Sequence, residues 1–298
     1  MAEWSGRSKG TPAGYRIFIF LIKNFGINAA YLLLKFVAFY FFIKPSKERK
    51  AIFWYFRNIH NYSKTKSHLS VYKNFVFLGQ SLIDKVVIMS GLPHKFTFNF
   101  DGEEHLRHLA NSGEGGFLIG AHTGNWEIAG YLLKRINTVI NIVMVQREHE
   151  NIKKLMNSVV RQNPNVKIIP IKEDMSHLFE INLALKRNEI IVIHGDRFVE
   201  GTKNTKHKFM QYEALFPTGV FYLAVKQQKP VVFVSALKES KTHYHFYATA
   251  PKKYSPAGKG RNNIINEILD DYVSNLEQIL IKYPEQWYNY YYFWDTKH

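Results

Sequence analysis

From about residue 95 onward, short apolar runs alternate with longer segments whose apolar residues recur every three or four positions. Short runs bounded by turn-forming residues are typical of buried strands, and the three-to-four spacing is typical of helices. The predicted strands are 95–100, 116–121, 139–145, 166–171, 190–194, 231–237 and 243–249. The predicted helices are 103–111, 126–134, 150–163, 175–187, 217–227 and 261–283. This alternation predicts an α/β fold with a mixed, mostly parallel sheet flanked by helices.

The N-terminal part has a different pattern, an almost uninterrupted apolar run from Gly26 to Ile43 that carries one charge, Lys35. The run is about long enough to approach a bilayer span. Basic residues flank both of its ends, so positive charge gives no orientation. We expect a membrane-attached helix, spanning or monotopic, with a buried helix of a soluble protein as the alternative. The chain thus divides into a membrane-associated segment, 1–45, and one further domain, 46–298, whose first part, 47–90, is predicted to be helical.

The charge of the chain narrows its possible partners. Its 40 Lys and Arg residues outnumber 24 Asp and Glu residues, which gives a net charge of +16. This excess predicts an acidic partner, which is an anionic membrane surface, an acidic protein or nucleic acid. Because no nucleic-acid-binding motif accompanies the charge, nucleic acid is the weaker choice. The absence of cysteine from the sequence excludes disulfides, thiolate metal sites and a cysteine nucleophile.

The most informative polar cluster runs from His122 to Glu127, where the predicted strand 116–121 ends and the next helix begins. Active sites of open α/β sheets are usually found at this position. A histidine there can accept a proton from a hydroxyl or an amine, while a carboxylate fixes its tautomer or stabilises the imidazolium. Gly124 allows a tight turn, and Asn125 can hydrogen-bond the turn or a ligand. A core histidine beside a surface glutamate would give the same spacing.

Other polar residues follow predicted strands in the same way. Arg147 comes after the third predicted strand, and Asp196 with Arg197 comes after the fifth. Arg147 either contacts a substrate or is a solvated charge in a loop. Asp196 and Arg197 either contact a substrate or form a structural salt bridge. Gly219, near the start of the next helix, permits close approach of a ligand, and the helix N-terminus suits an anion. The basic segment 202–208 lacks apolar periodicity and is predicted to be a loop.

Several common catalytic motifs are absent from the sequence. It has no Gly-x-Ser-x-Gly elbow, no phosphate-binding Gly-x4-Gly-Lys, no His-Glu-x-x-His and no Cys/His cluster. A serine hydrolase and a P-loop enzyme are therefore disfavoured. His243 and His245 share a strand face but lack a third ligand, so no metal site is predicted.

The segment 120–127, Gly-x-His-x-Gly-Asn-Trp-Glu, resembles the His-x4-Asp/Glu signature of the glycerolipid acyltransferase superfamily. It is most similar to the lipid A biosynthesis (lauroyl/myristoyl) acyltransferase branch. Three further blocks are similar to that branch in the same order: 195–198, where Arg197 replaces the usual Gln, then Phe216-Pro217-Thr218-Gly219, and finally Pro284-Glu285-Gln286-Trp287. The resemblance covers nearly the whole chain.

The resemblance implies an acyltransferase. His122, oriented by Glu127, would act as general base on a hydroxyl or amine of the acceptor, which attacks an acyl thioester directly. Backbone amides near Gly124 and Asn125 would stabilise the tetrahedral oxyanion. A non-catalytic protein that binds lipid or acyl carrier protein, and a lipid hydrolase that uses the same dyad, are the alternatives.

The resemblance also implies the substrates and the location. Acyl carrier protein or coenzyme A would be the donor, with no cofactor, and an acidic carrier fits the positive charge of the chain. Arg147 would bind an anionic part of a substrate, and Asp196, Arg197 and Gly219 would line the substrate site. The acceptor is a lipid A-like glycolipid, an aminolipid or a polyene-bearing lipid. The expected location is the bacterial inner membrane, with the active site on the cytoplasmic side.

Overall fold

The computed structural model describes residues 11–132, 138–145, 165–198, 201–255 and 260–294. By its internal contacts the chain forms two compact units. The first comprises residues 1–96, 146–162 and 283–292, and the second comprises 97–145, 163–282 and 293–298. The first unit therefore extends beyond the predicted segment 1–45, because the N-terminal helix packs on helices that follow it. That segment 1–45 is membrane-associated stays a prediction.

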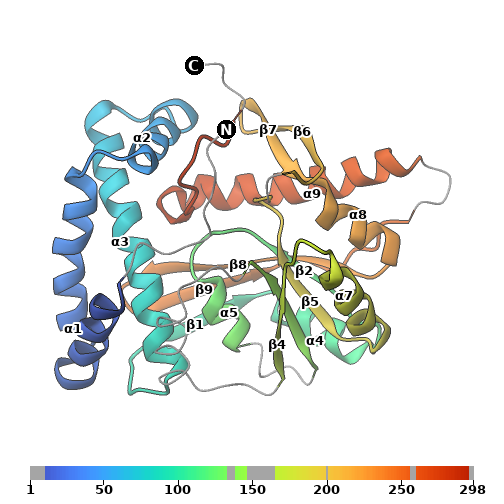
Figure 1. Ribbon diagram of the computed structural model, residues 1–298, viewed down its shortest axis with the longest axis horizontal. Coiled ribbons are helices and arrows are strands. Elements are labelled where there is room, and N and C mark those ends of the chain that lie inside the picture. The colour runs from blue at the N-terminus through green and yellow to red at the C-terminus, as the bar shows by residue number, and fades with distance from the viewer. Residues whose placement is uncertain (1–10, 133–137, 146–164, 199–200, 256–259, 295–298) are drawn as a thin grey trace. The chain divides into compact units, whose positions relative to one another are not determined.

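The second unit is built on a seven-stranded sheet in the order β1-β9-β8-β2-β5-β3-β4 (Figure 1). All neighbouring strands in it run parallel except β8 and β9, which are antiparallel. The strands are β1 Thr97–Asp101, β2 Gly116–Gly120, β3 Ile140–Met144, β4 Val166–Pro170, β5 Ile190–His194, β8 Val231–Ser240 and β9 His243–Ala248. The predicted mixed, mostly parallel sheet is confirmed.

Helices cover both faces of this sheet. They are α4 Glu103–Asn111, α5 Trp126–Leu132, α7 Ser176–Lys186, α8 Thr218–Gln227 and α9 Arg261–Lys282. In Figure 1, α9 lies on one side of the sheet, and α4 and α5 lie on the other. The apolar stripe predicted for α9 is buried, with Ile264, Ile268, Tyr272, Leu276 and Leu280 almost inaccessible to solvent. On the other face, Leu109 of α4 packs with Leu118, Ile140, Ile190 and Val232 of the strands.

The predicted loop 202–208 is wrong. Residues Asn204–Phe209 form strand β6, which pairs in antiparallel fashion with β7, Tyr212–Pro217. The turn between the two strands uses Met210 at a φ of 57°. Burial along β6 alternates with period two, although most of the residues are polar, so the hydrophobic pattern does not reveal the strand.

The first unit is helical. Its elements are α1 Pro12–Ile43, α2 Lys47–Trp54, a π-helical turn Tyr55–Ile59, α3 Lys64–Met89 and a short 3-10 helix Pro284–Gln286. The single helical region predicted for 47–90 is thus interrupted, and the chain restarts at α3, where the Ser63 hydroxyl caps the Lys66 amide. The predicted helix 150–163 lies outside the described residues.

Helix α1 lies along α3 within this unit (Figure 1). Ala30, Leu34 and Ala38 are buried on one face of α1, and the Tyr31 hydroxyl donates a hydrogen bond to Asp84 of α3. Residue Gly26 breaks the helical geometry, with φ 76° and ψ 176°. Among the described helices, α1 is the one that is long and apolar enough to cross a membrane.

The segment after α9 packs against α3. The side-chain amide of Asn74 donates to the backbone oxygens of Glu285 and Trp287, each at 2.9 Å. Ser70 donates to the Glu285 carboxylate at 3.1 Å, and Ser81 shares a hydrogen bond with Tyr288. The Pro-Glu-Gln-Trp block therefore serves the packing of the first unit.

Candidate active site

The strand register places the ends of β2 and β5 side by side. Gly120 and His194 are paired residues at the carboxyl ends of these two parallel strands. Residues two positions beyond them, His122 and Asp196, must therefore be neighbours, although 74 positions separate them in the chain. The topology thus brings together two of the predicted site residues.

His122 makes two hydrogen bonds to the same carboxylate. Its Nδ1 lies 2.7 Å from Oδ1 of Asp196, and its backbone N–H donates to Oδ2 at 2.9 Å. The Asp196 side chain is fully buried, and that of His122 is 14% exposed. Because an ionised carboxylate only accepts, the Nδ1 of His122 carries the proton and Nε2 carries the lone pair of the neutral ring.

Electrostatics favour this protonation state. Burial raises the pKa of Asp196, but the His122 ring and the Arg197 charge outweigh it and hold that pKa well below its usual range. Burial and the Arg197 charge lower the pKa of His122, against the opposing effect of Asp196. An ionised Asp196 beside a neutral His122 is the arrangement that a general base requires near neutral pH.

His194 is a third group at the site that the sequence analysis did not single out. Its ring centroid lies 4.4 Å from that of His122, and Trp126 contacts both rings at 5.3 Å. Burial, with the neighbouring His122 as second cause, lowers the pKa of His194 to about 3. The signal in the sequence is an imidazole that directly ends an apolar strand, as His122 nearly does.

Gly124 and Asn125 hold the loop that carries His122. Gly124 adopts a φ of +57°, and a Cβ there would lie 1.9 Å from the backbone oxygen of Ala236. The Asn125 N–H donates to that same oxygen at 2.7 Å, and its side chain reaches Ile128 N and the Tyr244 hydroxyl, each at 3.3 Å. The Asn125 N–H is therefore committed to β8, which disfavours it as an oxyanion donor, and a role for the amides near Gly124 and Asn125 stays a prediction.

The other predicted site residues lie in different elements and differ in their exposure to solvent. Glu127 is half-buried in the first turn of α5. Arg197 is half-buried beside Asp196, and its charge acts on both His122 and Asp196. Gly219 lies exposed in the first turn of α8 with open space around it. Arg147 lies outside the described residues.

An apolar cavity extends from the site under the sheet, on the side of α4 and α5. It has a volume of about 850 Å³, which includes space open to solvent. His194 and Val192 of β5 contribute to its wall, followed by Leu118, Val234, Phe246 and Phe100 of successive strands. Phe100 and Phe246 stack with their ring centroids 4.9 Å apart.

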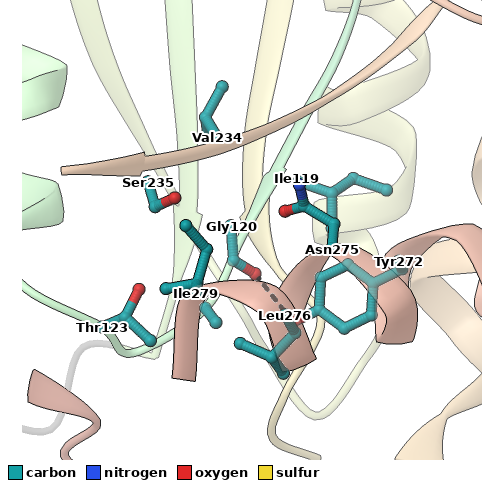
Figure 2. A pocket seen from close by; sticks show the side chains of 10 residues that line it. Ile119, Gly120, Thr123, Val234, Ser235, Tyr272, Asn275, Leu276 and Ile279 are labelled. Carbon is teal, nitrogen blue, oxygen red and sulfur yellow. Dashed lines mark hydrogen bonds between the residues drawn. The ribbon is translucent and has the colours of Figure 1, made fainter. Parts of the chain in front are cut away.

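A smaller cavity lies between the end of β2 and helix α9 (Figure 2); its volume is about 220 Å³, which includes space open to solvent. There the Tyr272 hydroxyl donates a hydrogen bond to the Gly120 backbone oxygen at 3.0 Å. Thr123 and Ser235 contribute to the walls of both cavities. The loop that carries His122 therefore lies where the two spaces approach each other.

Comparison with known proteins identifies the family of the chain. A family model described as bacterial lipid A biosynthesis acyltransferase matches residues 14–294. Among solved structures, the chain is similar to the 1-acyl-sn-glycerophosphate (LPA) acyltransferase PlsC from Thermotoga maritima, with 16% identity and a TM-score of 0.39. That likeness covers 84% of this chain and 95% of the other. No curated protein matches. The family match includes the strands, the loop of His122 and the block around Asp196, so this chain belongs to the bacterial lipid A biosynthesis acyltransferase family and is an acyltransferase.

Proposed function

We propose that this enzyme moves a fatty acyl chain from a thioester to a hydroxyl or amine of a membrane lipid, with His122 as general base. The observation that carries the proposal is the double hydrogen bond between His122 and the buried carboxylate of Asp196. It fixes the ring in the tautomer whose Nε2 accepts a proton.

The chemistry needs no covalent acyl-enzyme. The acceptor gives its proton to Nε2 of His122 as its oxygen or nitrogen bonds to the thioester carbonyl carbon. The tetrahedral intermediate then expels the thiolate, which takes the proton back from the imidazolium. Asp196 stabilises the transient imidazolium charge without taking the proton itself, as in other carboxylate–histidine pairs.

Asp196, rather than Glu127, is the residue that we assign to orienting His122. In its support, both Asp196 oxygens are bound by His122 and the carboxylate is inaccessible to solvent. Glu127, the carboxylate of the His-x4-Glu motif, lies in the first turn of α5 and is the second candidate for this role. The two assignments are separable by mutation, as described in the Discussion.

The apolar cavity is the proposed site of the acyl chain. It begins beside His194, on β5, and reaches Phe100, on β1, four strands away in the sheet order. At about 4.8 Å between neighbouring strands, this span is roughly 19 Å. Apolar walls suit a hydrocarbon chain that lies across the strands with its thioester carbonyl near His122.

The acyl donor and the lipid acceptor are proposed from the net charge of the chain and from its family. The net charge of +16 suits an acidic acyl carrier protein as donor and an anionic lipid as acceptor. Arg147 and Arg197 are the cations that we assign to anionic parts of these substrates. Membership of the family supports a lipid A-like acceptor and the inner membrane as the location, with the site facing the cytoplasm.

Membrane attachment is proposed to be monotopic and to use the outer face of α1. The residues of this face are large, apolar and exposed: Leu32, Phe36, Phe39 and Ile43, at helical spacing. Exposed cations, among them Lys23 and Lys44, flank this stripe. An apolar stripe with basic residues beside it is typical of a helix that lies in the interface of an anionic membrane.

The packing of α1 supports this mode over a span. Besides the Tyr31–Asp84 hydrogen bond, the Tyr72 hydroxyl of α3 donates to the Lys35 backbone oxygen at 3.3 Å. A bilayer around α1 would therefore also surround α3, including Lys73, which is exposed. A lysine at the bilayer centre costs about 2.5–3.5 kcal/mol even on the most lenient scale.

The test of the proposed function is acyl transfer in membranes that contain the enzyme. Fatty acyl thioesters of acyl carrier protein and of coenzyme A are supplied, and mass spectrometry follows lipids that gain an acyl chain. We expect acylated lipid with the wild type and none with His122→Ala. Free fatty acid that forms equally with and without lipid acceptor would indicate a hydrolase, and binding without any product would indicate a non-catalytic protein. Full transfer by His122→Ala would refute the base.

A further inference from the structure

The reaction needs hydrogen-bond donors for the oxyanion, and the loop amides around the base are largely committed elsewhere. The His122 N–H donates to Asp196, the Thr123 N–H donates to the Ala121 backbone oxygen, and the Asn125 N–H donates to Ala236. The backbone amides of these three residues are therefore unavailable to an oxyanion. A side-chain donor at the wall of the acyl cavity can take their place.

His194 has the position for this role. It is the last residue of β5, its ring lies 4.4 Å from the His122 ring between centroids, and it lines the apolar cavity. Gly120 is its partner in the neighbouring strand, and a Cβ there would just touch Cδ2 of His194, at 3.4 Å. No side-chain hydrogen bond to His194 is found among the described residues.

The chemistry of a buried imidazole agrees with the position. Burial and the neighbouring His122 keep the His194 ring neutral at physiological pH. A neutral imidazole has one N–H donor and one lone pair. It can donate a hydrogen bond to a carbonyl oxygen without placing a second positive charge beside the imidazolium that forms on His122.

We propose that His194 is a catalytic residue that donates a hydrogen bond from its ring N–H to the oxygen of the thioester carbonyl and of the tetrahedral intermediate. This inference rests on the proposed acyl transfer. As the acceptor oxygen bonds to the carbonyl carbon, the carbonyl electron pair moves onto that oxygen, and the acceptor proton goes to His122. When the carbonyl reforms, the C–S bond breaks and the thiolate leaves with the proton from His122. His194 keeps its own proton throughout.

The experiment compares four substitutions in membranes that show wild-type acyl transfer. His194→Ala removes the donor. His194→Asn and His194→Gln return an amide N–H near the positions of Nδ1 and Nε2, and His194→Phe fills the space without a donor. His108→Ala is the control, because His108 is an exposed histidine of α4 that lines neither cavity. Circular dichroism and thermal unfolding establish that each variant is folded.

We expect His194→Ala and His194→Phe to lower kcat about 100-fold with little change in KM for the acceptor, as loss of one oxyanion donor does. One of the two amide variants should recover at least tenfold of that loss, and His108→Ala should resemble the wild type. Recovery by His194→Phe instead of an amide, wild-type kcat in His194→Ala, or an equal loss in His108→Ala would each overturn the proposal. If wild-type membranes transfer no acyl chain, the proposed function itself has failed, and His194 is not the cause.

Discussion

Asp196 receives both a backbone and a ring hydrogen bond from His122, so one carboxylate fixes the position and the orientation of the imidazole at once. Both residues lie just beyond the ends of neighbouring parallel strands, β2 and β5. The positions of the two strands therefore determine where the His122 ring lies. This relationship gives the first prediction.

Substitution Asp196→Asn should lower kcat by about three orders of magnitude. An amide can donate to Nδ1 and so favours the tautomer in which Nε2 carries the proton, and loss of the correct tautomer is costly in such pairs. Steady-state acyl transfer by Asp196→Asn and by Glu127→Gln measures the two carboxylates side by side. A large loss in Glu127→Gln together with an active Asp196→Asn would return the orienting role to Glu127.

The apparent pKa of the acid limb of the pH–rate profile should be lower than the ordinary histidine pKa of about 6.5. Burial and Arg197 lower the pKa of His122, and a base works in its deprotonated form, so activity should persist into mildly acidic solution. Arg197→Met removes a nearby cation, which raises the pKa of His122 and moves the limb to higher pH. Lys172→Met, at an exposed lysine of the second unit, is the control and should leave the limb in place. An unmoved limb in Arg197→Met would contradict this electrostatic coupling.

Gly124→Ala should destabilise the enzyme by about 3 kcal/mol or more. The substitution places a Cβ against the Ala236 backbone oxygen at a positive φ, and both effects are unfavourable. Gly219→Ala is the matched control, because its surroundings are open and alanine is favoured over glycine in a helix by about 0.5–1 kcal/mol. Chemical unfolding monitored by circular dichroism compares the two. Equal stabilities would show that the loop adapts more readily than the structure indicates.

Polar substitution on the outer face of α1 should weaken membrane binding. The double variant Leu32→Ser with Phe36→Ser is expected to lose at least tenfold in partition to vesicles that contain anionic phospholipid, measured by flotation. Ile281→Ser is the control, because Ile281 is about as exposed as Phe36, at 69% against 67%, and is the one exposed large apolar side chain among the described residues of α9. Release of the wild type by alkaline carbonate would agree with interfacial attachment. Retention of the double variant after carbonate treatment would indicate a span.

Truncation of the Phe100 side chain should shift the preference of the enzyme toward longer acyl chains. Its ring stacks on Phe246 at the end of the cavity farthest in sheet order from His194. Phe100→Ala opens space there, so longer acyl thioesters should gain in kcat/KM relative to shorter ones. A panel of thioesters measures the profile, with Phe98→Ala on the same strand as control. An unchanged profile would place the acyl chain elsewhere.

Much of the architecture follows from local sequence pattern. The helix 103–111 and the strand 190–194 have the predicted bounds, because turn residues and apolar periodicity mark their ends. Strand β6 was missed because its polar residues hide the alternation of a half-buried hairpin. The break at residues 60–63 and the π-helical turn before it also escaped prediction, because apolar and aromatic residues continue through this segment.

The sequence identified His122 and Asp196 as candidate site residues, but it did not predict that they contact each other. His122 and Asp196 were both recognised at strand ends. Their pairing depends on which strands are neighbours, and the order of strands in a sheet is set by packing between distant segments. His194 shows the same limit, because a histidine that ends an apolar strand gives no sign of the second imidazole beside it.

The edge strand β1 has a consequence for how the enzyme is made. Its partner is β9, the last strand of the sheet in the chain, so another 146 residues must be synthesised after Phe100 before the Phe100–Phe246 stack can form. At about 5–20 residues per second, β1 waits on the order of ten seconds with its phenylalanines unpaired. Ribosomes that stop before β9 therefore release chains without the far wall of the apolar cavity. Completion of this wall therefore waits until the last strand of the sheet has been made.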